Sequence, residues 1–90
     1  MVTKPLIFSG KKLFVNFSTS AAGAVRIEIA DMDGNVIDGF AREDCIEMIG
    51  NEIEKEVSWE NKKNLNELSG IPVRLKFYLS DAHVYSFQFR

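Results

Sequence analysis

Ninety residues suffice for a single domain with a modest core, because domains begin at about 50 residues. Hydrophobic residues make up 46% of the chain and charged residues 27%, which is typical of a globular domain and not of a disordered one. The net charge is −2 and no basic run is present, which argues against nucleic acid as a partner.

Apolar residues alternate with polar ones along most of the chain, which is the period of a half-buried strand. Leu13, Val15 and Phe17 share one face, and Phe14 on the other face predicts that this second face is partly covered. The small residues at 19–23 predict a turn before the next strand. About seven short strands are predicted in all, near residues 4–8, 13–18, 24–30, 36–40, 52–60, 71–79 and 83–89.

The stretch "DMDGN" has two interpretations. Asp33 and Gly34 stand where a tight hairpin requires positive φ. Asp31, Asp33 and Asn35 also resemble the start of a calcium loop. Such a loop needs glycine in the sixth position and glutamate in the twelfth, whereas Gly34 is fourth here and Arg42 is twelfth. The pattern therefore favours the hairpin, and no metal ligand is predicted.

The stretch "NEIEKEVSWE" combines four glutamates with a tryptophan. Ile53, Val57 and Trp59 share one parity and the glutamates share the other, which predicts a core tryptophan and a solvated acidic face. Pairing with 71–79 would place the acids opposite Arg74 and Lys76. Same-face neighbours also match the carboxyl separation of about 5–9.5 Å found in glycosidases. Basic partners would keep every acid ionised, so no catalytic residue is predicted.

Two segments do not alternate cleanly. The stretch "AREDCIEMIG" indicates a structured loop or a single helical turn. The stretch "NLNELSG" predicts a short helical turn, with Asn64 as its cap, Glu67 three residues later and Gly70 at its end.

The remaining candidates for chemistry are single residues. Cys45 and His83 would have to meet in the fold to form a metal site or a nucleophile–base pair, and Asp44 and Glu47 are expected to raise the pKa of the Cys45 thiol. No glycine-rich phosphate loop is present, so no cofactor is predicted. The tyrosines Tyr78 and Tyr85 are candidates for stacking on sugar, although Trp59 is expected to be buried.

Together these patterns predict an all-β fold, a two-sheet antiparallel β-sandwich of about seven short strands with one short helical turn, in a single domain over 1–90. No apolar segment approaches the roughly 20 residues of a membrane span, and the stretch "MVTKPLIFSG" lacks the apolar core of a signal peptide. A soluble chain is therefore expected. Its localisation stays open.

Three stretches carry a resemblance that covers nearly the whole chain: "FSTSAAGAVRIEIADMDGNVIDGF", then "DC" with "GNEIEKEVSW", and "LSGIPVRLKFYLSDAHVYSFQF". The chain resembles a C-terminal domain of larger bacterial proteins related to propeller-type glycoside hydrolases. The resemblance implies a β-sandwich excised from a longer chain and packed against that chain's catalytic propeller. It assigns no catalytic residue to this domain.

The leading hypothesis is thus a non-catalytic accessory module that supports or orients the catalytic domain of a bacterial glycoside hydrolase-like protein. The parent chain, not this domain, would be the enzyme. One alternative is a carbohydrate-binding module that uses Tyr78 and Tyr85. Another is an independent small interaction protein with no link to sugars.

Overall fold

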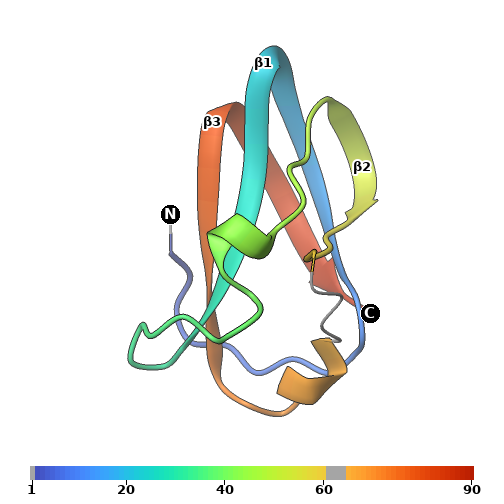
Figure 1. The fold of residues 1–90 in the computed structure, drawn as a ribbon. Helices are drawn as coiled ribbons and strands as arrows, with labels where there is room; N and C mark the ends of the chain where they lie inside the picture. Colours follow the sequence, from blue (N-terminus) through green and yellow to red (C-terminus); the bar gives the residue numbers. More distant parts are fainter. Residues whose placement is uncertain (1, 61–64) are drawn as a thin grey trace.

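The computed structural model describes residues 2–60 and 65–90. Within them the fold is all-β: one three-stranded antiparallel sheet in the order β2-β1-β3, with two short 3-10 turns and no α-helix. The strands are β1 (Leu13–Asp31), β2 (Asn51–Glu56) and β3 (Val73–Phe89), and the turns are η1 (Arg42–Asp44) and η2 (Leu65–Leu68). Figure 1 shows that β1 and β3 bend at the same end of the molecule.

The bend divides the sheet into two arms. In the first arm, residues 13–19 of β1 pair with residues 82–89 of β3, and β2 pairs with the other edge of β1. In the second arm, residues 24–31 pair with residues 73–80. A single hydrophobic core contains inward residues of both arms, because a two-stranded ribbon left open would expose its apolar face. Its largest fully buried side chains are Phe17, Phe40, Leu13, Ile27, Ile29 and Leu75, with the valines at 15, 25 and 73.

The predicted two-sheet sandwich of about seven strands is therefore wrong. Residues 19–23, predicted as a turn, lie within β1, and the predicted strands 71–79 and 83–89 are parts of the continuous strand β3. The segments near 4–8 and 36–40 form only isolated bridges, Leu6 with Val73 and Val36 with Ala30. Small residues such as those at 19–23 are typical of a chain reversal. Here they instead allow a hydrogen-bonded strand to bend sharply.

The geometry of the bend explains why glycine occupies position 23. Thr19 pairs with Ala82 and Ala24 pairs with Ser80, so four residues of β1 pass over the single residue Asp81, whose φ is +47°. A Cβ atom at Gly23 would lie 2.4 Å from the carbonyl oxygen of Asp81 and 2.5 Å from that of Ser80. Neither backbone oxygen can move away easily, so the two strands approach each other this closely only at a glycine.

The second arm of β1 has a fully satisfied outer edge. Val25 exchanges two backbone hydrogen bonds with Met48, and Ile29 bonds to the backbones of Ile37 and Phe40. Between them, side chains take over: the Ile27 N–H donates to the Cys45 Sγ at 3.3 Å, and the Trp59 Nε1 donates to the Ile27 carbonyl oxygen at 3.1 Å. Trp59 is 3% exposed, which confirms its predicted place in the core.

Ile53, Val57 and Trp59 were predicted to share the inward face. Val57 and Trp59, which follow β2, are buried, but Ile53 within β2 is 78% exposed. The register with β1 shifts between Val15, opposite Lys55, and Phe17, opposite Glu52. This bulge inserts one extra residue into β2 and reverses the faces beyond it. The pairing with 71–79 that was considered for this stretch does not form, because β2 pairs with β1.

The other local predictions mostly agree with the structure. Phe14 is half-buried, with the Arg90 guanidinium 4.5 Å from its ring centre. The "DMDGN" hairpin is confirmed: Gly34 has φ +90°, and the Asp31 carboxylate accepts the backbone N–H groups of Asp33 and Asn35. Residues 41–50 contain the single turn η1, and η2 lies within the predicted helical turn. The predicted cap Asn64 lies outside the described residues.

We predict that Gly23→Ala lowers the free energy of unfolding by about 1–3 kcal/mol, because the added methyl group forces the two strands apart at the bend. Urea denaturation monitored by circular dichroism measures the change. Ala22→Ser, at the exposed neighbouring position, should change stability by less than about 0.5 kcal/mol. Equal stability of Gly23→Ala and the unmodified chain would contradict the close approach.

Candidate functional site

A buried carboxylate lies on the outer face of the second arm. Glu28 of β1 is only 6% exposed, although its strand position faces away from the core. The Tyr78 hydroxyl donates to its Oε1 at 3.2 Å, and the Arg42 backbone N–H donates to its Oε2 at 3.1 Å. The ammonium group of Lys76 lies 3.8 Å from Oε1. Because each oxygen has a donor and a cation is close, the negative charge is compensated where it is buried.

Above this carboxylate, charged side chains surround a shallow cleft of about 300 Å³. The Arg42 guanidinium carbon lies 4.6 Å from the centre of the Tyr78 ring, and Arg26 forms a 3.5 Å ion pair with Glu47. Burial and the neighbouring Glu28 carboxylate raise the pKa of the Tyr78 phenol. Ala24 and Leu79 supply the apolar part of the wall. The cleft can offer hydrogen bonds from fixed charged groups, but Arg42 already covers one face of the aromatic ring.

The second tyrosine candidate lies on the other arm. Tyr85 is 64% exposed, and its hydroxyl forms a 2.9 Å hydrogen bond with the Ser18 hydroxyl. The bend at Asp81 separates it from Tyr78 along β3. The structure therefore does not bring Tyr78 and Tyr85 together as one stacking platform for a sugar chain.

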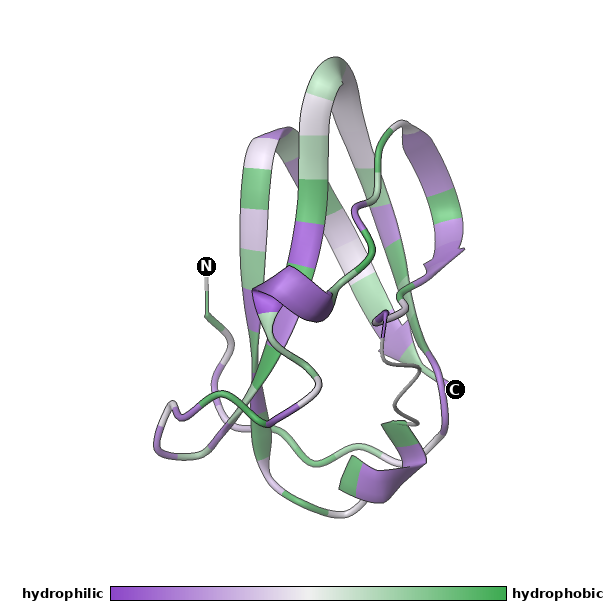
Figure 2. Cartoon of the chain, viewed as in Figure 1, coloured by the Kyte–Doolittle hydropathy of each residue, from purple (hydrophilic) through white to green (hydrophobic). Residues whose placement is uncertain are grey.

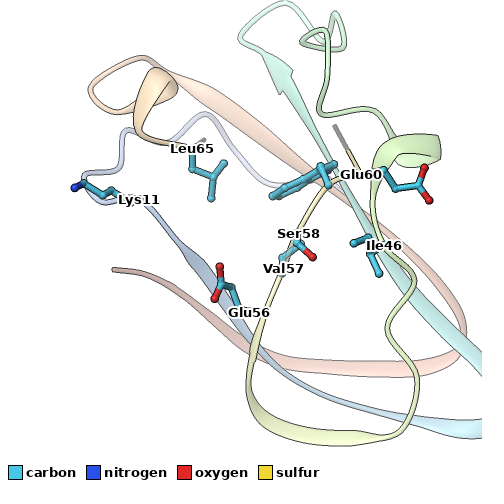
Figure 3. A pocket seen from close by; sticks show the side chains of 8 residues that line it. Lys11, Ile46, Glu56, Val57, Ser58, Glu60 and Leu65 are labelled. Atoms are coloured by element: carbon cyan, nitrogen blue, oxygen red, sulfur yellow. The ribbon is translucent and has the colours of Figure 1, made fainter. Parts of the chain in front are cut away.

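Two of the glutamates of "NEIEKEVSWE", Glu56 and Glu60, line a second cavity of about 400 Å³. Figure 3 shows Glu56 and Glu60 on opposite sides of the chain segment that joins them, so their carboxylates do not converge. Glu56 lies 3.9 Å from the Lys12 ammonium group, and Glu54 pairs with Arg90 at 2.6 Å. The hydrogen bond from Arg90 lowers the pKa of the Glu54 carboxyl, which opposes a role as a general acid.

The predicted partners of these acids were wrong in detail. Arg74 donates to the backbone carbonyl oxygens of Met32 and Thr3, and Lys76 pairs with Glu28. Two of the glutamates do pair with cations, but these are Lys12 and Arg90, which flank the first arm at its end away from the bend. The register of the sheet decides this, and alternation alone does not reveal register.

The single cysteine and histidine are placed apart in the fold. Cys45 is 2% exposed and lies against Ile27 of the second arm, whereas His83 lies on the first arm opposite Ser18. Burial raises the pKa of the Cys45 thiol, although the Ile27 N–H and Arg26 act in the opposite direction. Asp44 and Glu47, from which a raised pKa was expected, are not its cause. In residues 2–60 and 65–90 no group of three or more potential metal ligands forms.

The cluster of Glu28, Arg42 and Tyr78 was not found from the sequence. Alternation places Arg26 and Glu28 on the outward face, which is correct. The alternating pattern does not reveal that another segment of the chain covers that face. Residue 42 reaches Glu28 from fourteen positions away, in a segment without a regular period. A lone glutamate between two core isoleucines is the only local signal.

Comparison with known proteins gave no match: no family model, no curated protein and no solved structure is significantly similar to this chain. Within the part of the chain that the structure describes, no helix has the length and apolar character to cross a membrane.

We predict that Tyr78→Phe destabilises the fold by about 1 kcal/mol, because it removes a hydrogen bond to a buried carboxylate. The matched control is Tyr85→Phe, which loses an exposed hydrogen bond and should cost less than about 0.5 kcal/mol. Urea unfolding of both variants measures the difference. Equal effects of the two substitutions would contradict the special position of Tyr78.

The same pair of variants gives a pH test. The pKa of Tyr78 is raised in the folded state, so its contribution to stability is present below the ordinary phenol value of about 10. That contribution is lost as pH rises through the raised folded-state pKa. The stability difference between the unmodified chain and Tyr78→Phe should therefore shrink only at strongly alkaline pH. A difference already lost at neutral pH would contradict this origin.

Proposed function

We propose that this chain is a non-catalytic accessory module of a bacterial glycoside hydrolase-like protein, where it supports or orients the catalytic domain. The observation that carries the non-catalytic part is the arrangement of the acidic–aromatic stretch. Glu56 and Glu60 lie on opposite sides of their segment, and Trp59 donates to a backbone carbonyl in the core. The residues most suited to sugar cleavage thus have structural places: the tryptophan bonds to the sheet in the core, and the glutamates lie on the solvated face.

The link to glycoside hydrolases rests on the sequence resemblance alone. The accessory role is the one that the resemblance implies. The β-sandwich that it also implies is not retained, since the chain forms a single bent sheet. The ion pairs also suit a supporting role. Among the described residues, every ion pair except that of Glu28 joins exposed groups, and exposed pairs contribute little to any specific chemistry.

The length of the native polypeptide tests the accessory role first. We expect an antiserum against this domain to detect, in cells of the source organism, a product several times larger than the 10.2 kDa chain. In that larger protein, deleting the domain should lower the melting temperature while leaving kcat/KM per folded molecule unchanged. The isolated domain should fold and hydrolyse no chromogenic glycoside. A native product of about 10 kDa would overturn the accessory role, and glycoside hydrolysis that Glu56→Gln abolishes would overturn the non-catalytic one.

The second candidate function is carbohydrate binding, favoured by the cleft beside Tyr78. Its polar rim of Arg26, Arg42 and Glu47 resembles the few placed polar groups of a ligand site. Against it stands the guanidinium that covers one face of the Tyr78 ring.

Titration with mono- and oligosaccharides separates the two candidates. For an accessory module we expect no saturable amide shift in the NMR spectrum up to about 10 mM ligand. Saturable shifts that are confined to the cleft and that Arg26→Ala removes would favour carbohydrate binding instead. Tyr85→Ala, on the other arm, is the control for shifts that do not arise in the cleft.

A further inference from the structure

The two free edges of the sheet differ in chemistry. The outer edge of β2 carries Glu52, Glu54, Lys55 and Glu56, and Figure 2 shows this strand as mostly hydrophilic. Charged side chains of this kind protect an edge against pairing with another chain. The outer edge of β3 in the first arm, residues 82–89, carries no acidic, lysine or arginine side chain. This segment is called the β3 edge below.

Other parts of the sheet edges are covered by neighbouring segments. Residues 36–48 cover the second arm of β1, and the N-terminal segment bonds to Val73 and Leu75 of β3. Among the residues that the structure describes, none pairs with the open side of the β3 edge. A strand edge with exposed aromatic side chains and no charged ones can serve as a template for strand addition.

A bulge gives the β3 edge an unusual pattern of faces. Asn16 pairs with Ser86 and Phe17 pairs with Val84, so Tyr85 is the extra residue. Ala82, Val84 and Phe89 pack on the core, and the Phe87 ring lies 5.6 Å from that of Phe77. The intervening residues are exposed: His83, Tyr85, Ser86 and Gln88. From residue 82 to residue 89 the side chains therefore point in, out, in, out, out, in, out and in. This order is the same in both directions along the strand, and its midpoint lies between Tyr85 and Ser86.

We propose that the β3 edge is an interface between two copies of this chain, paired antiparallel about the point between Tyr85 and Ser86. Residues opposite each other in an antiparallel ladder share a face of the sheet. In this register Val84 lies opposite the second copy's Phe87, and Ala82 lies opposite its Phe89. On the outer face, His83 lies opposite Gln88 and Tyr85 opposite Ser86.

In this register the β3 edge is complementary to the same edge of a second copy. Each inward apolar residue lies opposite an inward apolar residue, and each exposed polar residue lies opposite an exposed one. No like charges meet, because the segment has none. The half-exposed Phe87, 37% accessible in the single chain, would gain a neighbour from the second copy and lose contact with water.

Sedimentation velocity across concentrations from about 1 µM to about 1 mM tests the proposal on the unmodified chain. The contact is a single strand edge, which is at the small end of protein interfaces, so we expect a reversible dimer with Kd of roughly 1–100 µM. Ser86→Lys places a lysine of each copy beside the two-fold axis, and it should raise Kd at least about tenfold. Ile53→Lys adds the same charge at the exposed β2 edge and should leave Kd unchanged.

A mixing experiment makes the register specific. Ser86→Glu alone should likewise raise Kd at least about tenfold, whereas an equimolar mixture of Ser86→Lys and Ser86→Glu should form a heterodimer with a lower Kd than either variant alone. Circular dichroism of each variant checks the fold, and the exposed position makes unfolding unexpected. A chain that is monomeric throughout the range overturns the proposal, as does a dimer that Ser86→Lys leaves intact. Neither result affects the accessory role, which the native product length tests separately.

Discussion

The continuous pairing of β1 with β3 through a shared bend is the constraint on which the rest of the fold depends. Two long strands that stay paired around the bend behave as one ribbon, so the inward faces of both arms come together at once. The bend requires β1 to pass over the β3 backbone within a distance that only Gly23 permits. The core between the arms therefore depends on a glycine that contributes no side chain to it.

The bend also explains the placement of Trp59 and Cys45. Folding the ribbon leaves the outer edge of β1 with backbone groups that need partners, and a buried group without one costs about 1–3 kcal/mol. An irregular segment cannot match every position of a straight strand. At Ile27 the Cys45 thiol and the Trp59 indole replace the missing backbone partners. Two residues that are common in active sites are thus committed to closing the sheet.

Much of the fold could be predicted from local patterns. The inward residues of β1, the core position of Trp59, the hairpin at Gly34 and the all-β class all follow from side-chain period and turn chemistry. The number of sheets and the partner of β2 could not be predicted, because both depend on register. A single extra residue, as at Tyr85 or beside Ile53, reverses every face beyond it. Alternation read along one strand does not reveal such a residue.

The burial of Glu28 in the candidate site also could not be predicted from side-chain period. Period alone places Glu28 outside, and its backbone position is indeed outside. Its burial depends on Arg42, Tyr78 and Lys76 converging from two other segments. An ionised carboxylate enclosed in this way requires each neighbour to stay in place, since removing one leaves a buried charge less compensated. The segment from 41 to 47 is thereby fixed against the outer face.

The edges of the sheet differ in whether they are covered and in whether they carry charges. In the second arm, the N-terminal segment bonds to Val73 and Leu75 of β3, and residues 36–48 cover the outer edge of β1. Among the described residues, β2 and the first arm of β3 have outer edges without a strand partner, and only the β2 edge carries charges. If solubility alone had shaped the chain, both open edges would be expected to carry lysine or glutamate. The uncharged β3 edge beside a charged β2 edge is more simply explained by a strand that binds there, and its symmetric order of faces matches a strand identical to itself.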